Sequence, residues 1–107
     1  MKNLGNLMKQ AQEMQARMAE LQEKLAAMEV EGSAGAGMVR VTMGGKGDLR
    51  RVKVEPSLLK PDEAEVVEDL IVAAAADARA KAERAAAEEM SKLTGGLQLP
   101  PGLKLPF

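Results

Sequence analysis

Apolar residues recur through residues 1–28 at alternating intervals of three and four positions, with polar residues between them. This spacing is typical of a helix that carries one narrow apolar seam. At ~1.5 Å per residue the helix would be ~40 Å long, too long for a small globule to cover. We therefore expect a partner helix, either later in the chain or on a second copy. The seam consists of Leu4, Leu7, Ala11, Met14, Met18, Leu21, Leu25 and Met28.

After this helix the apolar pattern changes to strict alternation, which is typical of β-strands. Glycine-rich stretches at 32–37 and 44–47 separate three short alternating runs. We expect an antiparallel meander over residues 28–55, with a flexible link at the first glycine stretch. One face should pack, and the opposite face should be charged. The packing face is led by Val30, Val39, Val41, Val52 and Val54, and the charged face by Arg40, Arg51, Lys53 and glutamates, with Leu49 also on that side.

A second long helix is expected over residues 62–93. Pro56 ends the third strand because it has no N–H to donate, and Pro61 suits the first position of a helix. Acidic residues follow at once, where they complement the helix dipole. Gly95 ends the helix, and the Pro/Leu-rich tail is either disordered or extended in a groove. The inner stripe begins bulky and becomes small: Val67, Leu70, Ile71, Ala74, Ala78, Ala82 and Ala85.

The predicted fold class is therefore α+β, in the order helix, three strands, helix. Residues 1–96 form one domain, and residues 97–107 form the tail. Because both helices are longer than the sheet is wide, their ends should project as arms. The chain has no Trp or Tyr and a single Phe, so its core is small and favours completion by a second copy.

The composition argues against catalysis. The chain has no His and no Cys, which removes the commonest general base, the thiol nucleophile and most transition-metal ligands. We expect no enzyme activity, no metal, no cofactor and no small-molecule substrate. No stretch is long and apolar enough to span a bilayer and no signal peptide is evident, so a cytoplasmic protein without a membrane partner is expected.

Basic side chains on the two helices are the remaining candidates for a site. The formal net charge is −1, but nine acidic and four basic residues fall within 61–93, which leaves the rest mildly basic. One interpretation is ordinary solvation and pairing with neighbouring acids, which spacing alone favours. The other is phosphate contact along a rod-like arm. The candidates for phosphate contact are Lys9, Arg17 and Lys24 on the first helix and Arg79, Lys81 and Arg84 on the second.

A separate set of apolar side chains is expected to pack in the helix seam or in a dimer. The side chains expected to do so are Leu7, Met14, Met18, Leu21, Leu25, Leu70 and Ile71. Three of the eight methionines fall on the seam, which favours core packing over an adaptable binding surface.

Several motifs together resemble the YbaB/EbfC family of nucleoid-associated proteins. The motifs are Gly37-Met38-Val39-Arg40-Val41-Thr42-Met43-Gly44-Gly45-Lys46-Gly47-Asp48-Leu49, Val54-Glu55-Pro56, Glu68-Asp69-Leu70-Ile71, Asp77-Ala78, Lys81-Ala82 and Leu93-Thr94-Gly95-Gly96. The resemblance covers nearly the whole chain. It implies a bacterial homodimer with tweezer-like helical arms that binds double-stranded DNA, associates with the nucleoid and affects DNA conformation and gene expression.

Two other functions remain open from the residues. An arm-bearing dimer could grip a protein partner without binding DNA, as a small helical chaperone does, and an exposed Leu/Met seam would favour that function. A membrane-surface helix is disfavoured because the stripe is narrow and lacks aromatic residues. If DNA is the partner, the absence of a recognition helix predicts weak sequence preference.

Overall fold

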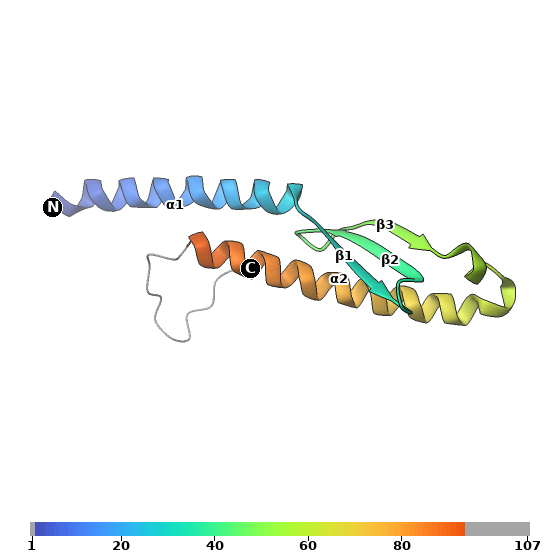
Figure 1. Cartoon of the computed structure of the whole chain (residues 1–107). Coiled ribbons are helices and arrows are strands. Elements are labelled where there is room, and N and C mark those ends of the chain that lie inside the picture. The colour runs from blue at the N-terminus through green and yellow to red at the C-terminus, as the bar shows by residue number, and fades with distance from the viewer. Residues whose placement is uncertain (1, 94–107) are drawn as a thin grey trace.

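The computed structural model describes residues 2–93, with side chains from Leu4 onward. The elements in this range follow the expected order of helix, three strands and helix, which confirms the α+β class (Figure 1). The expected tail, residues 97–107, lies outside the described residues, as does the glycine stop of the second helix. The elements are α1 (Lys2–Ala27), β1 (Glu29–Ala34), β2 (Val39–Gly44), β3 (Leu49–Val54), the 3₁₀ turns η1 (Pro56–Leu58) and η2 (Pro61–Glu63), and α2 (Ala64–Leu93).

The molecule is a rod rather than a globule. Its principal extents are 72 × 26 × 16 Å and its radius of gyration is 19.7 Å, whereas a compact domain of 100 residues has a radius of ~13 Å. The two helices run in opposite directions, and α1 extends well beyond the sheet and past the end of α2 (Figure 1). The expectation that the helices project is therefore confirmed.

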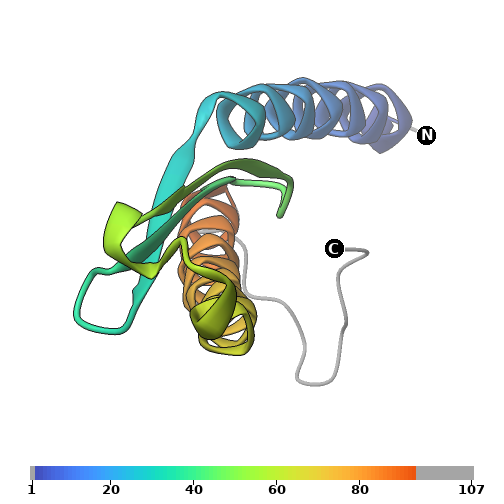
Figure 2. The same cartoon turned by 90° about the vertical axis from the view of Figure 1, so that its right-hand side faces the viewer.

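The strands form one antiparallel sheet in the order β1-β2-β3, with α2 packed on one face. The β2–β3 hairpin lies between the levels of α1 and α2 when the molecule is viewed along its length (Figure 2). Val39, Val41 and Met43 alternate along β2, point toward α2 and are at most 3% exposed. The core cluster contains Val39, Val41, Met43, Leu58, Ala74 and Ala78.

The first glycine stretch is not wholly a flexible link, so that expectation is wrong in part. Residues 32–34 belong to β1, and only residues 35–38 form the turn. Gly32 is buried because β1 crosses α2 at this point: a Cβ there would lie 2.7 Å from Ala78 Cβ and closer still to the backbone of Ala74. Gly32 therefore serves close packing rather than flexibility.

The expected assignment of β3 side chains to faces is altered by an irregularity in the β2–β3 ladder. A register shift between Thr42 and Met43 pairs Met43 with Leu49, so Leu49 lies on the face of Val41 and Val52, not on the charged face. Since α2 lies mainly under β1 and β2, Leu49 is 55% exposed and Val52 39%. Val52 therefore lies on the expected face of the sheet but is not packed against α2.

The second helix follows the expected stripe. Ala74, Ala78 and Ala82 are buried, and the bulkier residues at its start are partly buried against the sheet core. Leu70 and Ile71 therefore pack under the sheet within one chain. The α-helix begins at Ala64 rather than at residue 62, because residues 61–63 form a 3₁₀ turn.

We predict that Gly32→Ala lowers the free energy of unfolding by ~1–3 kcal/mol, the usual cost of overpacking a core that cannot relax. The matched control is Gly5→Ala, where a new Cβ meets nothing within 4 Å and the helix gains intrinsic propensity. Urea unfolding of both variants provides the measurement. Equal stability of the two variants would contradict the close β1–α2 crossing.

Candidate nucleic-acid interface

The three candidate cations of α1 form one stripe. At 3.6 residues per turn, Lys9, Arg17 and Lys24 fall within ~80° of one another around the helix. All three are exposed. Arg17 and Lys24 lie beside the apolar seam, ~80° from its centre, whereas Lys9 lies on the opposite side of the helix.

The candidate cations of α2 do not share a face. The same helical geometry places Arg79 ~140–160° away from Lys81 and Arg84, which lie close together. Arg79 lines a hollow of about 320 Å³ beside the β2–β3 turn, together with Gly45 and residues of both helices. The second arm therefore presents positive charge on two sides instead of along one row.

A groove of about 490 Å³ lies where α1 passes the end of α2. It brings Arg17 and Lys24 of α1 together with Lys92 of α2, which was not among the predicted contacts. Three cations face two carboxylates there, which leaves a positive balance. The groove is lined by Arg17, Glu20, Leu21, Lys24, Glu89, Lys92 and Leu93.

One carboxylate ties the two arms together in this groove. Glu89 Oε2 lies 2.7 Å from Lys24 Nζ, and Glu89 Oε1 accepts a hydrogen bond of 3.2 Å from Lys92. The Glu89 side chain is only 13% exposed. The bond from Lys24, with a smaller contribution from Lys92, holds the pKa of the Glu89 carboxyl below its usual value. Lys24 therefore has a structural role in joining α1 to α2.

Lys81 is also engaged within the chain. Its Nζ donates to the Glu31 carbonyl oxygen at 2.9 Å and lies 3.2 Å from Asp77 Oδ2. Asp77 in turn accepts the Ser33 N–H at 3.1 Å, and this bond, followed by that from Lys81, lowers the pKa of Asp77. Two side chains of α2 thus bind backbone groups of Glu31 and Ser33 at the free edge of β1, which hinders pairing of this part of the edge with another strand.

Arg50 was not predicted from the sequence, yet it fixes the angle at which α1 leaves the sheet. Its guanidinium donates to Asp48 at 2.8 Å, to Glu29 at 3.3 Å and to the carbonyl of Ala26 at 2.6 Å. The last bond satisfies a carbonyl at the end of α1 that has no partner within the helix. Gly45 N–H donates to the Met28 carbonyl at 3.1 Å beside it.

No sequence signal marked Arg50 as different from its neighbour Arg51. Its position depends on the register shift of β3 and on the path of α1, both of which are tertiary features. By contrast, the positions of Lys9, Arg79 and Arg84 agree with their predicted exposure, and no ion pair holds these three among residues 4–93.

Two properties of the described chain bear on other kinds of site. None of its helices is long and apolar enough to cross a membrane. Within the same residues, no cluster of three or more acidic, His or Cys side chains is arranged to hold a metal ion.

The geometry defines a class: a small α+β protein that carries exposed cations on two projecting helices joined by a three-stranded antiparallel sheet. Residues 1–97 match the model of the YbaB/EbfC DNA-binding family. The chain belongs to this family. Membership indicates a DNA-binding protein rather than an enzyme, in agreement with the sequence.

Two relatives align with this chain over their whole length. A nucleoid-associated protein of Paramagnetospirillum magneticum is 66% identical over 107 residues, and one of Granulibacter bethesdensis is 64% identical, with 100% of both chains covered in each case. An uncharacterized protein from Helicobacter pylori has the same fold, with a TM-score of 0.67 over 88% of this chain and 95% of its own, at 23% identity.

We predict that Arg50→Gln lowers the midpoint of urea unfolding at neutral pH more than Arg51→Gln does. The neighbouring substitution removes the same charge from a side chain without such contacts. The hydrogen bond from Arg50 lowers the pKa of Asp48 in the folded state. The contribution of this pair is therefore present above pH ~4 and is lost as the pH falls through the folded pKa.

The difference between the two variants should accordingly shrink in acid. A difference that is absent at neutral pH, or that grows as the pH falls, would contradict the stabilising role of the Arg50 contacts.

Proposed function

We propose that this protein is a nucleoid-associated protein that binds double-stranded DNA as a homodimer, with little sequence specificity. Through this binding it alters DNA conformation and gene expression in the cytoplasm, at the nucleoid. The observation that carries the proposal is the pair of long helical arms with exposed cations along them. The family's DNA-binding description and the names of the relatives support it.

The low specificity follows from how the charges are displayed. Lys9 and Arg17 on α1, and Arg79 and Arg84 on α2, are exposed cations spread along the arms. Cations so spaced neutralise phosphates, which positions a protein on a duplex but reads no bases. Base readout needs side chains presented together in a groove, and the dispersed cations of α2 do not provide that. Any preference would come from duplex shape and bending.

The homodimer is supported by the uneven burial of the α1 seam. Leu21 and Leu25 are each 6% exposed because α2 and the β2–β3 turn of the same chain cover them. Farther out along the arm, Leu4 is 63% exposed and Leu7 59%. We infer that the seam of a second copy covers this part, with Met14 and Met18, which are half-buried, continuing the contact.

For the dimer, we expect Leu7→Gln to weaken self-association by about a hundredfold to ten-thousandfold, because each of the two copies loses a leucine whose burial contributes ~1.5–3 kcal/mol. The control is Val72→Gln, which removes an apolar side chain that is 70% exposed on α2, away from the seam. Sedimentation equilibrium measures both. Unchanged association of Leu7→Gln would place the dimer contact elsewhere.

For DNA, we expect the affinity of the dimer for a random-sequence duplex to fall with salt, with a slope of about −0.9 per phosphate neutralised. Arg79→Gln and Arg84→Gln each remove two charges per dimer, so each should make the slope shallower by up to ~1.8. Lys81→Gln should change it less, since Asp77 already pairs with Lys81. Fluorescence anisotropy across a salt series provides the measurement.

A second candidate function has its own supporting observation. If the dimer contact lies elsewhere and leaves them uncovered, the exposed Leu4, Leu7 and Met8 at the end of the arm form an apolar surface that would suit a protein partner held between two arms. The salt series distinguishes DNA binding from the protein-interaction function. If the unsubstituted dimer does not bind duplex even at low salt, direct DNA binding is excluded and the protein-interaction function becomes the working hypothesis.

A further inference from the structure

The outward face of the sheet, which is the face away from α2, carries a cluster of cations that lies apart from the helical arms. Arg40 on β2 stands directly opposite Lys53 on β3, and Thr42 stands opposite Arg51. Residues that face each other across an antiparallel ladder project to the same side. Because Val39 and Val41 project toward α2 and are buried, these three cations project away from it. We call Arg40, Arg51 and Lys53 the sheet cluster.

The sheet cluster is not neutralised within the described part of the chain. Arg40 Nε lies 3.9 Å from Glu31 Oε1, and both side chains are more than half exposed, so this pair is loose. Among residues 4–93, Arg51 and Lys53 form no ion pair and no side-chain hydrogen bond. Like charges directly opposite on a ladder destabilise it. The sheet thus carries an electrostatic cost that an anion would relieve.

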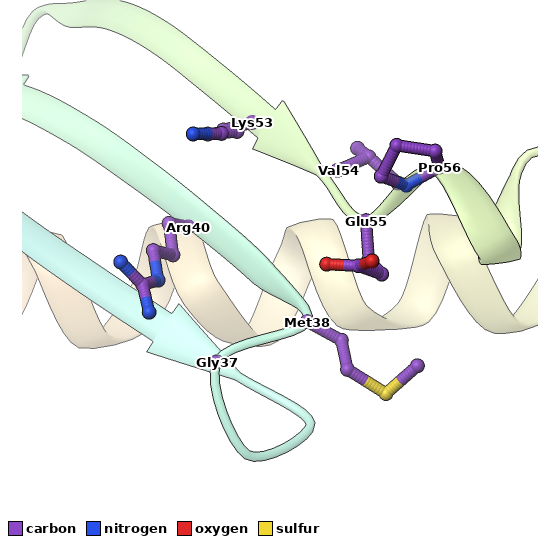
Figure 3. Close-up of a pocket in the computed structure, with 7 residues that line it drawn as sticks. All are labelled: Gly37, Met38, Arg40, Lys53, Val54, Glu55 and Pro56. Atoms are coloured by element: carbon purple, nitrogen blue, oxygen red, sulfur yellow. The ribbon is translucent and has the colours of Figure 1, made fainter.

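A hollow at one end of the cluster offers space for such an anion. It has a volume of about 170 Å³, several times the ~30 Å³ share of one water molecule. Arg40 and Lys53 reach it from neighbouring strands, and Glu55 lies at its far side (Figure 3). Gly37 borders the Arg40 guanidinium: a Cβ there would lie 3.5 Å from Nη2. Two cations against one carboxylate leave the hollow positive.

The spacing of the cluster suits a row of phosphates. Arg51 and Lys53 are two positions apart on one strand, or ~6.7 Å, and Arg40 is ~5.5 Å across the ladder from Lys53. Double-stranded DNA carries one charge per ~1.7 Å of its axis, so several phosphates pass within reach of these three long side chains. The outward face also lies on the side of the molecule where α1 runs (Figure 2), so one duplex can contact both.

We propose that the sheet cluster is a second contact for the DNA phosphate backbone, added to the helical arms. The inference rests on the proposed function, because it names a further surface for the same duplex. The arms reach along the DNA, whereas the sheet supplies a contact whose backbone is held by the β2–β3 ladder. A duplex that touches both is held at two places along the rod, which is a means of bending it.

The test compares three single variants of the full-length dimer: Arg51→Gln, Lys53→Gln and the control Lys60→Gln. Lys60 lies in the segment between η1 and η2 and loses the same charge, so any effect of net charge alone appears in all three. The probe is a random-sequence duplex titrated across a salt series. Circular dichroism and sedimentation confirm that each variant is folded and dimeric.

We expect Arg51→Gln and Lys53→Gln each to make the salt slope shallower by about 1.8, since each removes two phosphate contacts per dimer, while Lys60→Gln leaves the slope unchanged. Equal slopes for all three variants, with the unsubstituted dimer still binding, would overturn the sheet contact and leave the proposed function standing. Loss of the dimer in the sheet variants would also overturn it, by assigning this face to assembly. Absence of binding by the unsubstituted dimer would overturn both the sheet contact and the proposed function.

Discussion

The rest of the structure depends on β1 crossing α2 at a position where β1 has no side chain. Gly32 lets the strand approach the backbone of Ala74 and Ala78 more closely than any Cβ would allow. With no Trp, no Tyr and one Phe in the chain, the core cannot be filled by large side chains. The protein instead brings its backbones together, and the small residues of α2 make this approach close enough to bury Val39 and Val41.

The arms are positioned by contacts that build on this crossing. Asp77 and Lys81 bind the edge of β1 and so fix the rotation of α2 against the sheet. On the other side, Arg50 holds the end of α1, and the Lys24–Glu89 pair then ties α1 to α2. Within the described residues, the outer part of α1 has no such contact with its own chain. It is the part of the molecule that a second copy or another partner can use.

Much of the fold could be predicted from the sequence, because its elements are local. The seam of α1, the alternation of the strands and the alanine stripe of α2 each depend on the period of one segment. Two predictions failed where the cause was not local. The glycine stretch after residue 31 was predicted to be a flexible link, because nothing in its own sequence shows that α2 lies against Gly32. The face of Leu49 was misassigned because the ladder shifts register beside Met43.

The sequence predicted which cations of the candidate site are exposed, but not which of them bind other parts of the chain. Exposure of Lys9, Arg79 and Arg84 follows from helix geometry. That Lys24 and Lys81 serve to join elements could not be foreseen, since Glu89 and the Glu31 carbonyl are 65 and 50 positions away in the chain. The structural role of Arg50 could not be predicted for the same reason, because Glu29 and Ala26 are also distant in the sequence. Charge and spacing find surface cations, whereas the partners that occupy them depend on the assembled fold.

In the proposed function, a frame held by the β1–α2 crossing presents cations to the DNA backbone. The most direct measurement is a titration of the isotopically labelled dimer with a random-sequence duplex, followed residue by residue through its amide NMR signals. We expect changes along the basic stripe of α1 and the second half of α2, with none at the Gly32 crossing. Changes confined to the apolar seam around Leu7, or no changes at all, would contradict the proposed function.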